Sequence, residues 1–442
     1  TTGDRLDVPC ELYHDGAAPL RAARPWWKVV ATDGRVLAQG SWPARDVPVG
    51  RSHVLGSVQA DLSSFPAPLA CRLVLGLLGS EGSNGWNLWV YPAGDAAAFP
   101  PTLAVARDWA DAAPALAAGR AVLLLPAQAG LGWNSPPLDR TPFFWNRIMN
   151  PGWSRMLGMW VEAAHPALAA FPTENFGDWQ WVGLAGRTRA LNLDGLPPDF
   201  RPIVQPVDDW NRNWRLGLVF EAKVGPGRLL ACSADIETDL DQRPAARQLR
   251  ASLVEYLSGP SFQPKQSLSP DQVRTLFFDT RIMARLGAKA DGPAAAAIDG
   301  DPNTFWLAGG PRGPRHPHVW TVSFPRPVSI AGFVAMNRQN HRDHEGDIRR
   351  YRLEAAGTDA TWKEIAAGEL ASTWEPQTVR LPAAVTAGSL RLTALDGFGT
   401  DTSAALAEFA VMYDGPPVGE AGPRAVDYKK ARSESTDVDE GN

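Results

Sequence analysis

Ala297-Ile-Asp-Gly-Asp-Pro-Asn-Thr-Phe-Trp306 is the most informative run of this chain. Its centre, Asp299 to Thr304, brings Asp, Asn and Thr side chains together with Gly and Pro, the residues that favour tight turns. A hard cation such as Ca²⁺ prefers a shell of oxygen ligands, which these residue types supply. The run therefore predicts a turn that either binds a cation or is closed by ordinary Asx hydrogen bonds.

The residues around this turn have the alternation of half-buried β-strands. Val319-Trp-Thr-Val-Ser-Phe324 and Gly388-Ser-Leu-Arg-Leu-Thr393 place apolar side chains at every second position. We expect a β-sandwich over residues 278–414, with Trp306 and Trp320 in its core. The polar, charged stretch 415–442 is typical of a disordered tail.

Several further motifs accompany the turn in the same order as in a known family. Together with Pro317-His318, Asn337-Arg-Gln339, Gly346-Asp-Ile348 and Ala407-Glu-Phe409, the run resembles the discoidin-like F5/8 type C domain. Many carbohydrate-binding modules of family 32 share that fold. The resemblance implies a jelly-roll β-sandwich that recognises a glycan.

The resemblance also implies two sites. A structural Ca²⁺ would lie beneath the turn, and its ligands would be Asp299, Asp301, Thr304 and Glu408; the alternative is an Asx turn capped by Glu408. Arg338 matches an arginine whose fork of donors suits vicinal sugar hydroxyls. Glu345 stands where the family has Asn, which argues against galactose-type specificity, and Phe398 is a stacking candidate. Surface ion pairing and loop packing are the alternative roles of Arg338 and Phe398.

The earlier part of the chain contains two further domains and a linker. Short strand-like runs between turn residues predict a β-sandwich over residues 1–100. Residues 105–262 alternate apolar runs with helices, among them a helix from Pro244 to Tyr256, and indicate a flavodoxin- or amidotransferase-like α/β domain. Residues 263–277 form a linker with a brief helix, opened by the capping box Ser269-Pro-Asp-Gln272.

These first 262 residues resemble a second family. Asn84-Gly-Trp-Asn-Leu-Trp-Val-Tyr-Pro92, His165-Pro-Ala-Leu168, Asp178-Trp-Gln-Trp181 and Phe220-Glu-Ala-Lys-Val-Gly225 are similar to the region that follows the catalytic barrel in bacterial, β-galactosidase-like proteins of glycoside hydrolase family 2. The resemblance implies an accessory region of a secreted or periplasmic enzyme of polysaccharide degradation. Its partners would be a glycan and an upstream catalytic domain of the same protein.

We expect no catalytic residues in this chain. It contains no Asn-Glu pair, which carries the acid/base of family 2, and a barrel takes about 250 residues. One alternative is that the α/β domain is itself a carbohydrate-active hydrolase, using Asp208, Glu221 and Asp235. Another is that the discoidin-like domain binds a protein.

Composition further narrows the classes of molecule that the protein could bind. The formal net charge of −5 argues against nucleic acid or an anionic membrane, and no run is long and apolar enough for a membrane span. Three cysteines offer no metal-ligand spacing, and Cys232 is expected to be buried. His341 and His344 have metal-compatible spacing, although a solvated loop is the simpler interpretation. Because the chain begins Thr1-Thr2-Gly3, we expect a processed chain or a fragment.

Overall fold

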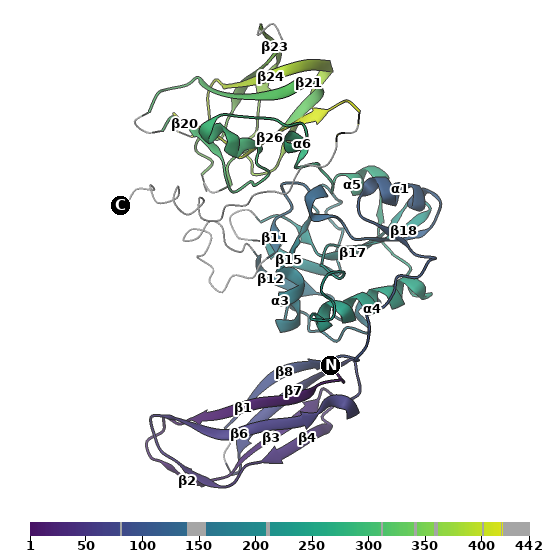
Figure 1. Cartoon of the computed structure of the whole chain (residues 1–442), viewed down its shortest axis with the longest axis vertical. Helices are drawn as coiled ribbons and strands as arrows, with labels where there is room; N and C mark the ends of the chain where they lie inside the picture. The colour runs from purple at the N-terminus through teal and green to yellow at the C-terminus, as the bar shows by residue number, and fades with distance from the viewer. Residues whose placement is uncertain are drawn as a thin grey trace. The chain divides into compact units, whose positions relative to one another are not determined.

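A computed structural model describes residues 1–79, 82–138, 156–208, 213–310, 313–339, 343–357, 361–399, 402–416 and 418. The chain divides into two compact units, Thr1–Phe278 and Asp279–Asn442. Strands dominate both units, as predicted (Figure 1). Most of the predicted tail, residue 417 and residues 419–442, lies outside the described residues.

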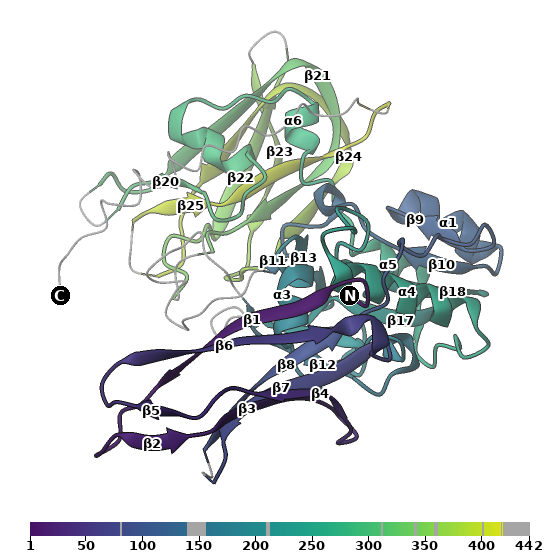
Figure 2. The same ribbon diagram turned by 60° about the horizontal axis from the view of Figure 1, so that its bottom comes forward.

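The first unit begins with a two-layer β-sandwich. One layer is the sheet β4-β3-β7-β8, and β1 and β6 pair to form the other (Figures 1 and 2). Alternate residues of β3, such as Trp27 and Val29, are buried against Val58 of β6 and Leu73 of β7. The strands are β1 (Arg5–Tyr13), β2 (Leu20–Ala23), β3 (Pro25–Ala31), β4 (Val36–Ser41), β5 (Arg45–Val47), β6 (Ser52–Asp61), β7 (Leu69–Leu77) and β8 (Ser83–Val90).

The rest of the first unit is built on a seven-stranded sheet of order β12-β15-β17-β18-β10-β9, with β19 also beside β17. Its strands are β9 (Ala104–Ala106), β10 (Ala121–Leu124), β12 (Met156–Val161), β15 (Val204–Asp208), β17 (Val219–Val224), β18 (Gly227–Cys232) and β19 (Ser267–Leu268). Two small ladders join β11 (Pro137–Leu138) to β13 (Thr188–Arg189) and β14 (Leu191–Asn192) to β16 (Leu216–Gly217).

This sheet is mixed, which differs from the flavodoxin-like arrangement that we expected. β10 runs parallel to β9 and β18, whereas β17 is antiparallel to β18 and β15. The reason is the Gly225-Pro-Gly227 turn, which joins β17 to β18 directly. A parallel pair would need a crossover of about a dozen residues, and no room for one exists there.

Helices lie on both faces of the sheet. Phe220 and Ala222 of β17 pack in one core with Leu116 of α1, whereas the intervening Glu221 meets Tyr256 of α4. Successive strand residues point to opposite faces, so α1 and α4 cover different sides. The helices are α1 (Trp109–Ala117), α3 (Trp179–Ala185), α4 (Pro244–Ser258) and α5 (Pro270–Arg274). The predicted helix at 244–256 and the capping box at Ser269 are confirmed.

The second unit is the β-sandwich predicted from the sequence. Its main sheet has the order β23-β22-β24-β21-β26, and β20 pairs with β25. Trp306 and Trp320 are buried, as expected, and Trp320 packs against Phe409. The elements are α6 (Ile282–Arg285), the 3₁₀ helix η4 (Gly292–Ile298), β20 (Trp306–Ala308), β21 (His318–Met336), β22 (Arg350–Ala356), β23 (Trp362–Glu369), β24 (Gln377–Ala394), β25 (Ala404–Leu406) and β26 (Glu408–Tyr413).

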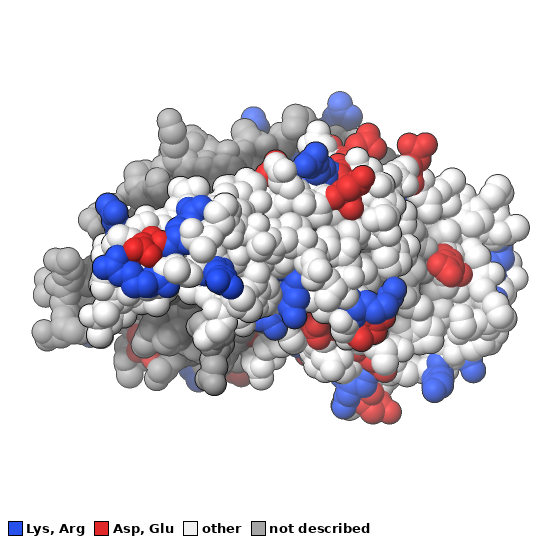
Figure 3. Space-filling view, turned by 90° about the horizontal axis from the view of Figure 1, so that it is seen from below, with Lys and Arg blue, Asp and Glu red and all other residues white. Residues whose placement is uncertain are grey.

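All three cysteines are buried and free, and burial raises the pKa of the Cys232 thiol to about 12. The predicted burial of Cys232 is confirmed. On the face drawn in Figure 3, acidic and basic side chains are interspersed among wide uncharged areas. Within the described ranges, no helix is long and apolar enough to cross a bilayer.

Candidate functional site

Two of the predicted sugar contacts, Glu345 and Phe398, come together in loops of the second unit. The Gly346 N–H donates to the carbonyl of Phe398 at 3.2 Å, and the Phe398 N–H donates to the carbonyl of Asp347 at 2.9 Å. Gly399, at φ +83°, permits the approach, because a Cβ there would lie 2.6 Å from Glu345 Cγ. Phe398 is half-buried rather than an exposed platform, so its ring offers only part of its surface.

Arg338, the third predicted contact, lies near an aromatic ring and a buried carboxyl group. Its Cζ is 5.2 Å from the centroid of Phe305, which is within reach of a cation–π interaction. Its positive charge also acts on Asp347, where it opposes the rise in pKa that burial causes. Arg338 thus belongs to the same loop region as Asp347, whose backbone meets Phe398.

Three residues of this region were not singled out in the sequence analysis as sugar-site residues. His344 Nδ1 is 2.8 Å from Asp347 Oδ2, and the His344 ring lies 4.5 Å from that of Trp374. Asp347 has no exposed surface, and burial raises the pKa of its carboxyl to about 8. His344 is therefore half-buried rather than fully solvated, and His341 lies outside the described residues. Because Trp374 comes from the distant β23–β24 loop, local sequence contains no signal for this cluster.

The loop that carries Phe398 is fixed at its start by ion pairs. Asp396 accepts hydrogen bonds from Arg349 Nη2 at 2.7 Å and from Arg350 Nε at 2.6 Å. These contacts, with that of Arg349 the strongest, hold the pKa of Asp396 well below its usual range. The carboxylate therefore stays charged and ties the loop to the start of β22.

The predicted cation turn concentrates oxygen atoms around one hydroxyl. Thr304 Oγ1 lies 2.8 Å from Asp299 Oδ2, 3.0 Å from the Asp301 carbonyl and 3.2 Å from the Ala296 carbonyl. A hydroxyl has one proton and donates it to one acceptor at a time. Carboxylate, hydroxyl and carbonyl oxygens are the ligand types that Ca²⁺ accepts, so the chemistry of this donor set fits the ion. An Asx turn is present as well, since Asp299 Oδ1 accepts from the Asp301 N–H at 2.7 Å.

Glu408, the fourth predicted ligand, is the first residue of β26 and is completely buried. The strand that follows the turn, β20, pairs with β25, and β25 ends two residues before Glu408. In the described part of the chain, no group of three or more His, Cys, Asp or Glu side chains is placed to hold a metal ion. A cation in this region would therefore need Thr304 and backbone carbonyls in addition to any carboxylate.

The carboxylates that we considered for a hydrolytic α/β domain have separate structural roles. Asp208 Oδ2 accepts from the Trp214 N–H at 3.0 Å, Glu221 Oε2 from the Tyr256 hydroxyl at 2.7 Å, and Asp235 Oδ2 from Arg243 Nη1 at 2.9 Å. Paired catalytic carboxylates share one substrate site. Each of these three is instead engaged with its own partner, and Asp209 lies outside the described residues.

Three stretches of the chain match known domain families. Residues 284–409 match the F5/8 type C domain, residues 104–278 match a domain of unknown function (DUF8487), and residues 4–92 match another (DUF8488). The second unit therefore contains an F5/8 type C, discoidin-like domain, as expected from its motifs. The expected relation to glycoside hydrolase family 2 stays a prediction, because the other two matches name no activity.

Individual relatives cover parts of the chain. A sialidase from Micromonospora viridifaciens is 31% identical over 144 residues. The match covers 32% of this chain and 22% of the sialidase. The family 32 carbohydrate-binding module of C. perfringens NanJ, in complex with galactose, is 23% identical with a TM-score of 0.27, over 30% of this chain and 97% of that one. A second module, CpGH89CBM32-5 from Clostridium perfringens, in complex with GalNAc-β-1,3-galactose, is 24% identical with a TM-score of 0.27, over 29% and 97%.

Proposed function

We propose that this chain is the non-catalytic, carbohydrate-binding accessory region of a bacterial family 2 glycoside hydrolase, β-galactosidase-like and extracellular or periplasmic. Its second unit holds the enzyme on a glycan, and the catalytic barrel belongs to an upstream part of the same protein. The observation that supports glycan binding is the loop region where Arg338, Glu345 and Phe398 gather around the buried Asp347.

The chemistry of these side chains suits a sugar ring. The planar guanidinium of Arg338 offers several donors in a fixed fork, which matches hydroxyls on neighbouring carbons. Glu345, as a carboxylate, accepts hydrogen bonds from hydroxyls, where an amide would both donate and accept. The half-buried ring of Phe398 supplies an apolar surface beside them.

We also propose that a structural Ca²⁺ stabilises the turn at 299–304. Asp299, Thr304 and the carbonyls of Ala296 and Asp301 supply the oxygens already gathered there, and Glu408 supplies a buried carboxylate. The ion would offset the repulsion between these oxygens and order the loop that leads into β20. It takes no part in binding the sugar.

Isothermal titration calorimetry on the whole chain tests the glycan site. Galactose and GalNAc-β-1,3-galactose are the first probes, followed by an array of plant and microbial glycans. We expect a glycan on the array to bind and its Kd to rise at least about tenfold in Arg338→Ala, since a buried hydrogen-bonding anchor contributes roughly 1.4 kcal/mol or more. Phe398→Ala should weaken binding in the same direction.

Arg326→Ala is the matched control. Arg326 is exposed in the middle of β21, between the register shift at Ser323 and the start of the next paired segment at Val328. Its removal should leave binding unchanged. If no glycan binds, or if Arg338→Ala binds as tightly as the parent, the proposal fails and a protein-interaction role takes its place.

A further inference from the structure

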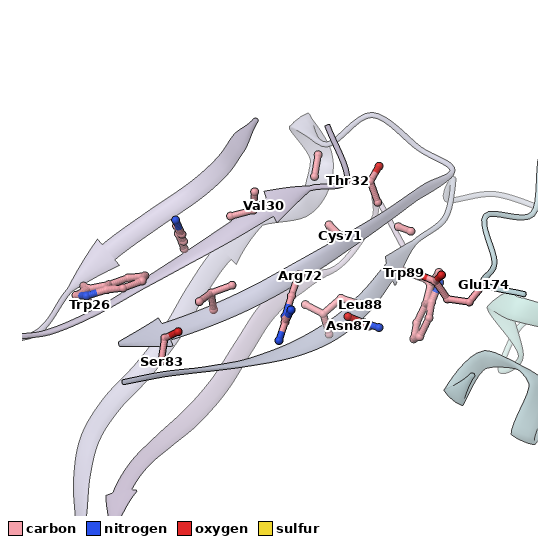
Figure 4. Close-up of a pocket in the computed structure, with 14 residues that line it drawn as sticks. Trp26, Val30, Thr32, Cys71, Arg72, Ser83, Asn87, Leu88, Trp89 and Glu174 are labelled. Atoms are coloured by element: carbon pink, nitrogen blue, oxygen red, sulfur yellow. The ribbon is translucent and has the colours of Figure 1, made fainter. Parts of the chain in front are cut away.

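The outer face of the N-terminal sandwich contains a hollow of about 440 Å³. Its floor is formed by β3, β7 and β8, and Glu174 borders it beside Trp89 (Figure 4). The volume lies in the range of small-molecule sites, roughly 300–1,000 Å³. The strands of this face lie within residues 4–92, which match DUF8488. The F5/8 type C match, at residues 284–409, does not extend to them.

Strand alternation determines which side chains reach this face. On β3, Trp27 and Val29 point into the core, so Trp26 and Lys28 point outward. Arg72 of β7 is paired with Asn87 of β8, and both side chains are exposed. Figure 4 shows Arg72 and Asn87 between Trp26 at one end and Trp89 at the other.

Two glycines shape the hollow. Gly76 is paired with Trp26, and a Cβ at Gly76 would lie 2.5 Å from Trp26 Cζ2. A Cβ at Gly85 would likewise lie 2.5 Å from Arg72 Nε. The indole ring and the guanidinium therefore lie directly over glycine backbone, where any larger residue would displace them.

The two cations of this face, Lys28 and Arg72, make few polar contacts within the described part of the chain. Neither Lys28 nor Arg72 has a hydrogen bond or ion pair with any residue that the structure describes, although Lys28 Nζ lies 5.5 Å from the centroid of the Trp26 ring. Elsewhere on the same sandwich Arg21 and Arg35 are each paired with an aspartate. Among the described residues, the face thus presents two positive charges without an ion pair beside aromatic and amide groups, and one carboxylate, Glu174, at its border.

We propose that this face is a second glycan-binding site and that its ligand is an acidic oligosaccharide, a chain of sugars that bear carboxylates. Trp26 and Trp89 stack on pyranose rings, Arg72 and Lys28 bind the carboxylates, and Asn87 bonds to hydroxyls. Along the strand direction the two tryptophans are six residues apart in register, about 20 Å, which accommodates several sugars. The site is independent of the one around Arg338.

Calorimetry on the whole chain with defined ligands tests this proposal. The probes are the tetramers of galacturonic acid and of mannuronic acid, with cellotetraose as the neutral comparison. We expect at least one acidic tetramer to bind, cellotetraose to bind much more weakly, and affinity for the acid to fall as salt is raised, because salt screens exposed charges. Trp26→Ala and Arg72→Gln should each raise the Kd about tenfold.

Matched controls lie close by. Trp86 is paired with the inward-facing Leu73 and is 48% exposed, so Trp86→Ala removes a tryptophan outside the hollow. Arg35→Gln removes an arginine that is paired with Asp33. Both controls, and Arg338→Ala, should leave binding of the acidic tetramer unchanged, which separates this site from the one in the second unit.

Three results would overturn the proposal. The first is that neither acidic tetramer binds, and the second is that Arg72→Gln, which changes an exposed side chain, binds as tightly as the parent. The third is equal affinity for cellotetraose, which would remove the role of the two cations. A change of oligomeric state in Trp26→Ala, measured by sedimentation, together with no binding of uronates would assign the face to a second copy of the chain.

Discussion

Asp347 is a carboxyl group that folding holds away from water. Its side chain has no exposed surface and lies 2.8 Å from His344 Nδ1, and burial raises its pKa to about 8 despite the charge of Arg338. In the unfolded chain an aspartate loses its proton near pH 3.9. Between about pH 4 and pH 8 the folded state therefore keeps a proton that the unfolded state has released, and stability falls as pH rises through this window.

Asp347→Asn should remove this part of the pH dependence. The amide has nearly the same shape and no charge to lose, so the second unit of the variant should lose less stability than the parent as pH rises from about 4 to 8. Calorimetric Tm values across this range provide the measurement, and the exposed Asp343→Asn is the control. Equal slopes in the parent and Asp347→Asn would show that the carboxyl ionises normally.

At the scale of elements, a close approach of backbone to backbone in the first unit joins β18 to α1. A Cβ at Gly227 would lie 2.6 Å from the Leu116 carbonyl oxygen and 2.7 Å from its Cα. Gly227→Ala would therefore push the end of α1 away from the sheet, at a cost of about 1–3 kcal/mol. Urea denaturation of the first unit measures the loss of stability.

Gly158→Ala is the comparison for that variant. Gly158 lies in β12 of the same sheet, and nothing lies within 4 Å of a Cβ built there. A stability change of less than about 0.5 kcal/mol is expected for Gly158→Ala. If Gly227→Ala is no less stable than Gly158→Ala, the contact with Leu116 does not determine the packing of α1.

The same elements show which features of the fold can be predicted from the sequence. Signals carried by neighbouring residues were correct: the helix predicted from Pro244 to Tyr256 is α4, and Ser269 opens a helix with its capping box. Strand order depends on partners far along the chain, so the mixed sheet around Gly225-Pro-Gly227 was not predicted. The same holds for the site. The motif containing Arg338 can be recognised from consecutive residues, whereas Trp374, which belongs to the same region, comes from another loop.

At the scale of the whole molecule, the chain consists of two compact units, Thr1–Phe278 and Asp279–Asn442. Each has its own core, and chains of this kind commonly unfold in more than one step. The proposed Ca²⁺ ligands all belong to the second unit. A ligand that binds only a folded state stabilises that state, by about 2.7 kcal/mol at a hundred times its Kd.

Differential scanning calorimetry in calcium and in EGTA should therefore resolve two unfolding transitions, and calcium should raise the Tm of one of them. In Thr304→Val the calcium response should be lost, because the hydroxyl that gathers Asp299 and two carbonyls is gone. Thr321→Val, at an exposed position of β21, should keep the response. If calcium moves neither transition of the parent, the oxygens around Thr304 are held by hydrogen bonds alone, and the turn owes its shape to the Asx bond between Asp299 and Asp301.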